Sequence, residues 1–352
     1  MERACRQEVT PPAKRPKSLF MKQLPRATIH LSNIVSNWQA LDGLHPGATT
    51  AAVVKADAYG LGAVPVARAL LRSGCSTFFV AYLEEALAVR KALGLGPRIF
   101  VLNGPTRKEM SAYIAAGITA VLSSPDHLKA WANAPKGTSA LHFDTGMNRL
   151  GLKAAALATT LTDLQRLQPV LVMSHLACAD ETGNAMSTAQ LKAFDDIASA
   201  FPDTPASLAN SAGCYLGKGF GYDLIRPGIG LYGGSLPPKG LRTKQALTLD
   251  AAILSVFEGK AGETVGYGAT QTLQQNTQLA TVGIGYADGL PRTGGNNLVA
   301  YLDDVPCPVV GRISMDLTTI DVSKAQDQAA RAGTLGYEIL TGLNNRVERV
   351  YA

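Results

Sequence analysis

A lysine at the end of an apolar run is the first residue whose setting suggests chemistry. Lys55 follows the buried-strand pattern of AAVVKADAYGLG, residues 51–62. One interpretation is that the lysine lies at the mouth of the strand and its ammonium reaches water. The other is that partial burial lowers the pKa of the amine, which can then act as a nucleophile or a base. The rest of the chain has to distinguish the two.

Other polar side chains also follow apolar runs. In chain order these residues are Lys55 and Tyr59, the segment DTGMNR at 144–149, His175 in SHLACAD, Asn210 with Ser211, and Arg226 in RPGIG. Each alone has a structural explanation: a glycine-containing turn, a helix cap, a hydrogen-bonded core histidine or an arginine paired with an acid. Together they favour a functional site, because the carboxyl ends of the strands in a parallel barrel meet at one rim.

Several uncharged donors in this set suit a phosphate group. They are the Ser211 hydroxyl, the amides of Gly213 and of the PGIG loop, and tyrosine hydroxyls, which are the kinds of donor that hold phosphate near helix N-termini. A phosphate site beside an amine points to an aldehyde cofactor bound as an imine. Pyridoxal 5'-phosphate is the obvious candidate.

The elements that must position these residues alternate regularly. Eight apolar runs are separated in several places by segments with helical spacing, such as LEEALAVRKAL; the runs are AAVVKA, TFFVA, RIFVL, TAVLS, ALHFD, VLVMSH, SLAN and LIRPGIGLYG. This alternation predicts a parallel βα array, and eight strands are the number that closes a (β/α)₈ TIM barrel. An open doubly wound sheet is the alternative.

The predicted domains follow from changes in this pattern. Residues 27–246 are expected to form the cofactor-binding barrel. Residues 247–352 contain β-rich segments punctuated by Gly and Asn, which predict a second, mainly β domain. Residues 1–26 hold seven Lys or Arg and two acids, which supply +5 of the net charge of +6, and this basic tail is expected to be disordered.

Composition excludes several classes of protein. With the charge confined to the tail, no basic stripe remains to follow a phosphate backbone, so we expect no nucleic-acid partner. No apolar run approaches the roughly 20 residues of a membrane helix and no secretory signal is apparent, so we expect a cytoplasmic protein without a membrane partner. The five scattered cysteines form no C-x-x-C pair, which argues against a disulfide framework or a zinc site.

Nine motifs, in order, resemble those of the alanine racemase family. They are VVKADAYGLG, DTGMNRLG, SHLACAD, NSAG, IRPGIGLYG, VGYGAT, GIGYADG, GRISMD and GYEIL, and they extend from residue 27 to the C-terminus. The resemblance implies a homodimer that interconverts L- and D-alanine with pyridoxal 5'-phosphate, either to supply D-alanine for peptidoglycan or to degrade it. GYADG and GRISMD are the most diagnostic of these motifs.

The resemblance also implies two catalytic bases. Lys55 would hold the cofactor covalently and then serve as one base, while Tyr286 in GYADG would reach the active site from the partner subunit as the other. Racemisation needs one base on each face of the substrate, because a planar carbanion must be reprotonated from the opposite side. A tyrosine hydroxyl ordinarily has a pKa of about 10, so His175 and Arg226 are expected to assist it.

The remaining site residues are implied in the same way. Arg226 would face the pyridine nitrogen of the cofactor, where a guanidinium does not readily give up a proton. Arg149 and the backbone amide of Met315, the latter from the partner subunit, would bind the substrate carboxylate. The residues at the family's phosphate-binding positions are Tyr59, Ser211, Gly228, Ile229 and Tyr337, with Asn210 beside them.

Two residues depart from the family pattern. Many members carry a carbamylated lysine two residues before the aspartate of DTGM, where this chain has His142. An inorganic anion or another acceptor would then take the place of that lysine in orienting Arg149. Ser314 replaces a cysteine found in several relatives, so thiol-directed inhibition is not expected there.

Three other functions share part of this pattern. A single-barrel pyridoxal phosphate-homeostasis protein lacks the second domain, and a barrel-type decarboxylase would have a carboxylate in place of Arg226. A broad-specificity amino-acid racemase shares most of the chemistry, but such enzymes are usually exported.

Overall fold

The chain divides into two compact units. The computed structural model describes residues 24–132, 137–234, 243–302, 305–324 and 347–352. One unit comprises Thr28–Thr248 with Arg349–Ala352, and the other comprises Leu249–Glu348 with the residues up to Ala27. We call them the barrel unit and the β unit.

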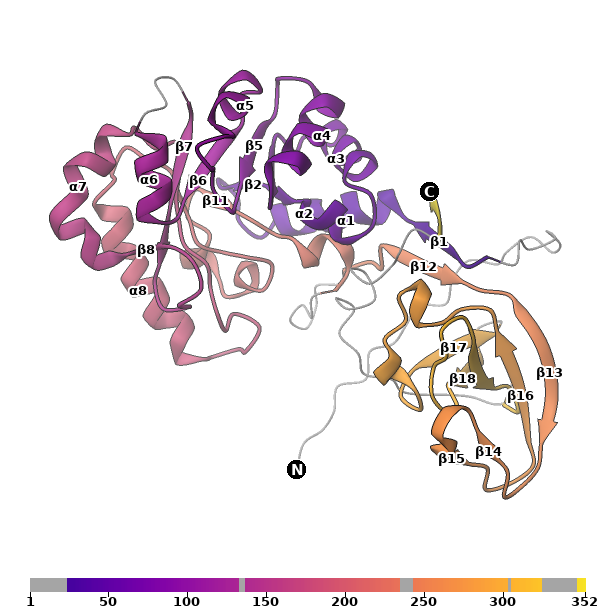
Figure 1. Ribbon diagram of the computed structural model, residues 1–352. Coiled ribbons are helices and arrows are strands. Elements are labelled where there is room, and N and C mark those ends of the chain that lie inside the picture. The colour runs from indigo at the N-terminus through magenta and orange to yellow at the C-terminus, as the bar shows by residue number, and fades with distance from the viewer. Residues whose placement is uncertain (1–23, 133–136, 235–242, 303–304, 325–346) are drawn as a thin grey trace. The chain divides into compact units, whose positions relative to one another are not determined.

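Parallel strands form the barrel unit, and their order follows the chain (Figure 1). The sheet runs β3-β4-β5-β6-β7-β9-β10, and β11 pairs in parallel with β2, which directly precedes β3. The bounds are β2 Thr49–Thr50, β3 Ala52–Val53, β4 Thr77–Val80, β5 Arg98–Val101, β6 Thr119–Leu122, β7 Ser139–Asp144, β9 Val172–Met173, β10 Ala206–Ser207 and β11 Leu224–Ile225. A short strand, β8 Leu152–Lys153, pairs in parallel with β7.

Backbone hydrogen bonds on both sides of β11 close the sheet. On one side the Asp223 and Arg226 amides donate to Ala206 and Ala209, at 3.1 and 3.0 Å. On the other, the Ala51 amide donates to Ile225 at 3.0 Å. The predicted barrel is therefore confirmed, and the open doubly wound alternative is wrong. Runs such as TFFV and TAVL are buried along their whole length, as expected for parallel strands covered on both faces.

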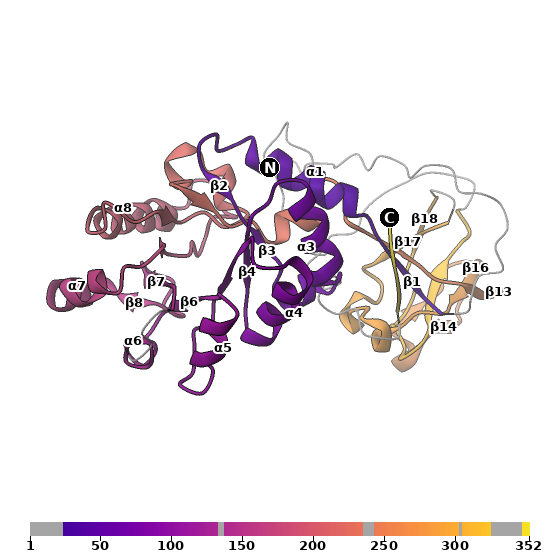
Figure 2. The same cartoon turned by 90° about the horizontal axis from the view of Figure 1, so that it is seen from above.

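Helices surround the curved sheet (Figure 2). They are α1 Leu31–Asp42, α3 Ala63–Arg72, α4 Leu83–Leu93, α5 Met110–Ala115, α6 Pro125–Trp131, α7 Leu157–Arg166 and α8 Ala185–Ser199, while α2 Lys55–Tyr59 is a single turn directly after β3. Each long helix buries one face; α4 buries Leu83, Ala86 and Val89 at helical spacing. Among the described residues, no helix is both long and apolar enough to cross a membrane.

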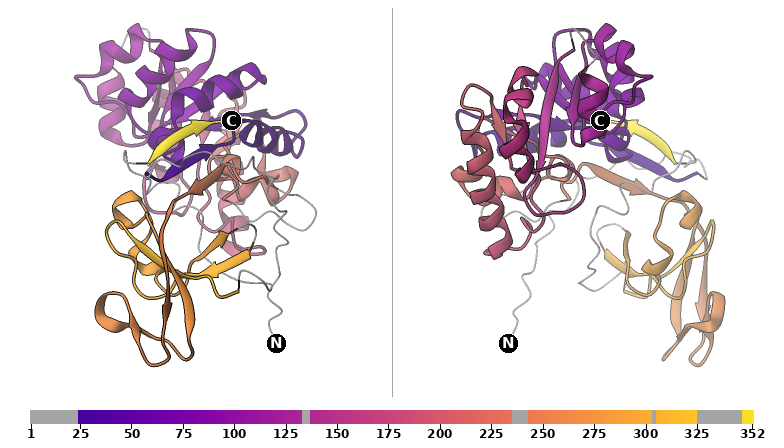
Figure 3. Two further views of the ribbon diagram at one scale, coloured as in Figure 1. Left: turned by 90° about the vertical axis from the view of Figure 1, so that its right-hand side faces the viewer. Right: turned by 60° about the vertical axis from the view of Figure 1, so that its left-hand side comes forward.

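The β unit, coloured orange in Figure 3, is built around an antiparallel sheet in the order β13-β16-β19. The strands are β13 Ile253–Gly259, β16 Thr277–Val282 and β19 Thr318–Asp321, with the pairs β14 Thr264–Val265 and β15 Gln271–Thr272, and β17 Val299–Leu302 and β18 Val305–Pro308. Ala280, Ile313 and Ile320 belong to its core. A further sheet, made of β1 Arg26–Ile29, β12 Leu247–Asp250 and β20 Glu348–Tyr351, belongs to neither unit alone, because each strand contains residues of both. A mainly β second domain is therefore confirmed.

Candidate active site

The barrel places most of the predicted site residues at the carboxyl ends of its strands. Lys55 follows β3, Arg149 lies in the loop after β7, His175 follows β9, Ser211 follows β10, and Arg226 directly follows β11. Because all these strands are parallel, the residues share one rim. Tyr337 lies outside the described residues, so its assignment to the phosphate site stays a prediction.

The amine of Lys55 is held in a setting that disfavours its charge. Burial lowers its pKa below the usual value, and the positive charge of Arg149 lowers it further, while Glu85 partly opposes the shift. This environment is the one that the nucleophile interpretation of Lys55 requires.

The turn that carries Lys55 has an unusual backbone. Ala56, Asp57, Ala58 and Tyr59 all adopt left-handed conformations, with φ between 51° and 56°. Such a conformation costs an L-residue about 1–2 kcal/mol, and it occurs mostly at single glycines or asparagines. Four consecutive strained residues directly after the lysine indicate that the surrounding structure holds this turn in place. Nothing in the residue types of KADAY signalled it.

The Ser211 hydroxyl organises the predicted phosphate site. Its oxygen accepts hydrogen bonds from the amides of Gly228 and Gly230, at 2.8 and 3.0 Å, so its own proton stays available for a ligand. The Tyr59 hydroxyl lies close by, since a Cβ added at Gly228 would lie 2.3 Å from it. Glycine at 228 therefore allows the Tyr59 hydroxyl to lie this close to the backbone.

Asn210 lies in the neighbouring turn, and both the oxygen and the nitrogen of its side-chain amide are hydrogen-bonded. Its oxygen accepts from the Gly213 amide at 2.9 Å, and its nitrogen donates to the Leu176 carbonyl at 3.2 Å. The Gly213 amide, which the sequence suggested as a phosphate donor, is thus already paired. Asn210 joins the loops after β9 and β10, and this contact supports the position of Ser211.

Arg226 is buried inside the barrel, with 4% of its surface exposed. Its guanidinium donates to the Ser207 hydroxyl and to the Ser174 and Leu208 carbonyls. Burial lowers its pKa to about 10, so it remains a cation at neutral pH. Burial also lowers the pKa of His175 well below the usual value, as do the charges of Arg226 and Arg149, so the imidazole is neutral.

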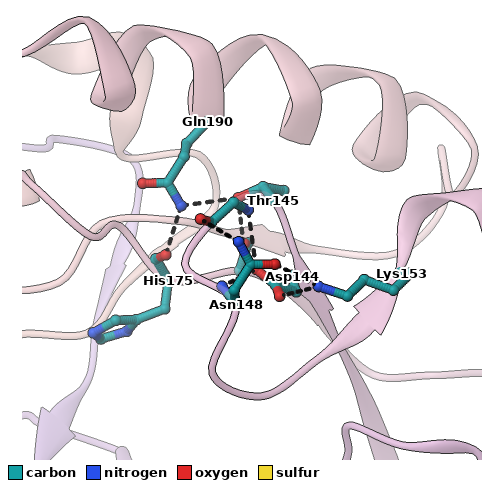
Figure 4. Close-up of polar contacts among 8 residues, drawn as sticks. Asp144, Thr145, Asn148, Lys153, His175 and Gln190 are labelled. Atoms are coloured by element: carbon teal, nitrogen blue, oxygen red, sulfur yellow. Dashed lines mark hydrogen bonds and ion pairs between the residues drawn. The ribbon is translucent and has the colours of Figure 1, made fainter.

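The loop that carries Arg149 is fixed by Asp144 (Figure 4). One carboxylate oxygen accepts from the Gly146 and Asn148 amides, and the other accepts from Lys153 at 2.6 Å. Lys153 also donates to the Asn148 side chain at 2.8 Å. Burial would raise the pKa of Asp144, but Lys153 and the two amides lower it by more, so the carboxylate stays ionised.

Gln190 joins this loop to the one after β9, as Figure 4 shows. Its side chain comes from α8 and is fully buried. Its nitrogen donates to the His175 carbonyl at 2.9 Å and to the Thr145 hydroxyl at 3.2 Å, while its oxygen accepts from the Ala177 amide at 2.8 Å. Sequence reasoning missed both Gln190 and Lys153. A signal for Gln190 existed, because it is a polar residue on the buried face that includes Phe194 and Ile197.

His142 lies deep in the barrel and is uncharged. Burial, followed by the charges of Arg226 and Arg149, lowers its pKa to about 4. Its Nδ1 lies 3.4 Å from the Ser123 hydroxyl, and its Nε2 is buried with no hydrogen-bond partner. It lies beside Arg149 and His175 around a space too narrow to hold a water molecule. His142 therefore cannot supply the negative charge that a carbamylated lysine would offer to Arg149.

Tyr286 and Met315 meet on the surface of the β unit. The Tyr286 amide donates to the Ser314 carbonyl at 3.0 Å, and the Ala287 amide donates to the Met315 carbonyl at 2.9 Å. A Cβ at Gly285 would lie 2.3 Å from that Met315 oxygen, so glycine is needed at this position. Tyr286 is 39% exposed and Met315 is 52% exposed. The two residues assigned to a partner's active site thus occupy one accessible patch.

Comparisons with known proteins agree over most of the chain. The family model "Alanine racemase, N-terminal domain" matches residues 29–236, and "Alanine racemase, C-terminal domain" matches residues 246–330. An alanine racemase of Rhodospirillum rubrum is 44% identical over 355 residues, covering 92% of this chain and 95% of the relative. A catabolic alanine racemase of Agrobacterium fabrum is 41% identical, covering 92% of this chain and 91% of the relative.

A solved structure is similar over the same extent. The crystal structure of alanine racemase from Bartonella henselae, which has covalently bound pyridoxal phosphate, superposes with a TM-score of 0.85 at 33% identity. The match covers 94% of this chain and 99% of that one.

We predict that His142 makes the protein less stable in acid. The unfolded chain takes up a proton at His142 near pH 6.5, while the folded chain resists protonation until about pH 4. The free energy of unfolding should therefore fall by about 2 kcal/mol from this residue between pH 7 and pH 5. Urea denaturation at both pH values should show a smaller acid-induced loss in His142→Asn. An equal loss in both proteins would contradict the assignment.

Proposed function

The chain belongs to the alanine racemase family, and from this premise we propose that it is a pyridoxal 5'-phosphate-dependent enzyme that interconverts L- and D-alanine. The observation that carries the proposal is the pairing of two features at one rim of the barrel. One is the Lys55 amine with its lowered pKa, and the other is the site around Ser211, Gly228 and Tyr59.

The residues of this rim fit the cofactor. Lys55 supplies an amine for covalent attachment, and Ser211, Gly228, Ile229 and Tyr59, with Tyr337, would hold the phosphate. The Gly228 amide donates to Ser211, so it would exchange that bond for one to the phosphate. Once bound, the cofactor withdraws electrons from the substrate and acidifies its α-proton. Arg226 would donate a hydrogen bond to the ring nitrogen and keep its own proton, because its pKa of about 10 stays above neutral pH. A barrel-type decarboxylase needs a carboxylate at that position.

The substrate would be oriented by its carboxylate. Arg149 and the Met315 amide of a second copy are the proposed donors, and the guanidinium gives a charge-assisted hydrogen bond. The clamp of Asp144 and Lys153 fixes the loop that leads to Arg149. Because His142 is neutral, the charge of Arg149 stays available to the substrate.

Two bases would move the α-proton. Lys55 would act at one face of the substrate, and Tyr286 of a second copy would act at the other. The neutral imidazole of His175 can accept a hydrogen bond from a phenol, and the buried cation of Arg226 would favour a phenolate.

The β unit supports a homodimer with shared active sites. Its strand β13 exposes four large apolar residues, Ile253, Leu254, Val256 and Phe257, by 41–60%. Monomeric proteins rarely leave so many apolar side chains exposed together. A second copy is the proposed cover, and the Tyr286–Met315 patch would then be presented to the partner's barrel. The proposed reaction could supply D-alanine for peptidoglycan or break D-alanine down. The proposed location of the protein is the cytoplasm.

The reaction itself is the first test. Purified cofactor-loaded protein should bring the optical rotation of an L-alanine solution to zero, and it should do the same from D-alanine. The same assay with a panel of small amino acids distinguishes an alanine racemase from a broad-specificity racemase. Optical rotation that persists in the presence of cofactor-loaded protein would contradict the proposal.

Attachment of the cofactor tests Lys55. The Lys55→Ala protein should lose the absorbance of a cofactor joined to its amine, and racemisation should fall by more than about a hundredfold. Lys192→Ala is the control, because it removes an exposed lysine on α8 and leaves the amine of Lys55 in place. An unchanged absorbance in Lys55→Ala would exclude this residue as the attachment point.

Solvent exchange tests the two-base assignment. Tyr286→Phe should slow removal of the α-proton from L-alanine by about 100-fold to 10,000-fold, and should affect D-alanine less, because only one face loses its base. Deuterium incorporation from each enantiomer measures the two rates. Tyr301→Phe, a change at a tyrosine that is 62% exposed on β17, is the control. Equal losses for both enantiomers in Tyr286→Phe would contradict the assignment.

A further inference from the structure

The left-handed turn after β3 needs an external support. Four residues in sequence, from Ala56 to Tyr59, have positive φ angles and none is glycine. Within the turn, the Ala58 amide donates to the Val54 carbonyl at 2.9 Å and the Gly60 amide to the Ala56 carbonyl at 2.9 Å. These bonds are also available to the ordinary right-handed turn, so they do not select the strained conformation.

Glu85 contacts the turn at its first strained residue. Its Oε1 accepts a hydrogen bond from the Ala56 amide at 2.7 Å. Its Oε2 accepts from the Ala81 and Tyr82 amides, at 2.7 and 3.2 Å, which lie at the start of α4. One carboxylate therefore joins the loop after β4 to the residue next to Lys55. Charge-assisted bonds of this kind are among the stronger ones in proteins.

We propose that Glu85 is a positioning residue that holds the left-handed turn and thereby sets the direction of the Lys55 amine. This proposal depends on the proposed function in one respect, which is that Lys55 carries the cofactor. The negative charge of Glu85 also opposes the lowering of the Lys55 pKa that burial and Arg149 cause. Glu85 thus acts on the position of Lys55 through the backbone and on its charge through space.

A second contact holds the other end of the turn. The Arg349 side chain, near the C-terminus, donates to the Gly60 carbonyl at 2.9 Å. The Asp57 carboxylate accepts from the Ala63 amide at 2.7 Å and so joins the turn to α3. Support from Glu85 is therefore expected to matter most at the Lys55 end, because the Gly60 end has contacts of its own.

Hydrogen exchange measures this support directly. In cofactor-loaded Glu85→Ala, amides of residues 55–59 should exchange about tenfold faster or more, because one charge-assisted hydrogen bond is lost. The cofactor should dissociate more readily by a similar factor, and kcat for alanine should fall more than KM rises. Glu84→Ala is the matched control, since Glu84 is the exposed neighbour with the same charge. This control should leave all three values unchanged.

The alternatives give distinct results. Unchanged exchange in residues 55–59, or an increase spread evenly over the barrel, would overturn the positioning role. If Glu85→Ala does not fold, hydrogen exchange in Glu85→Gln tests the proposal instead. Glutamine keeps one neutral acceptor, so the exchange rates of the same amides should rise by a smaller factor. Unchanged rates in those amides would overturn the role. Exchange and cofactor release need no turnover, so they remain informative even if the wild-type protein failed to racemise alanine.

Discussion

Concentration of positive charge at one end of the barrel is the constraint on which the rest of the structure depends. Arg226 is buried, Lys55 is partly buried and the exposed Arg149 adds a third positive charge nearby, while His175 and His142 are held neutral beside them. Moving like charges out of water is costly unless something of opposite charge joins them. An anionic cofactor and a substrate carboxylate meet that need, and the same environment lowers the pKa of the amine that must react.

Hydrogen bonds between loops hold these groups in place. Asp144 and Lys153 fix the loop to Arg149, Gln190 joins that loop to the one after β9, and Glu85 supports the turn after β3. Glu85 bonds backbone amides on two segments, and Gln190 bonds backbone groups after β9 together with the Thr145 hydroxyl. Asp144 bonds two amides of its own loop together with the Lys153 side chain. A rim made of loops can therefore keep a defined shape, which an active site requires because small displacements of reacting groups are costly.

The chemistry is divided between the two units. The barrel unit carries the proposed amine and cofactor site, while the β unit carries Tyr286 and Met315. Backbone hydrogen bonds between residues 286–287 and 314–315 fix those two residues relative to each other, so the β unit can present them together. This division is consistent with a site completed by a second copy of the chain.

The sequence by itself determined the barrel, the mainly β second domain and the family. Long apolar runs in parallel strands and short motifs are local properties, so they can be read without a structure. The left-handed turn at 56–59, the pairing of Gly213 with Asn210, the neutral state of His142 and the contacts of Glu85 and Gln190 were decided only by the tertiary structure. These features depend on burial and on residues far apart in the chain, such as Ala56 and Glu85. A hydrogen bond or a pKa shift arises only when folding brings such groups together and removes water from around them.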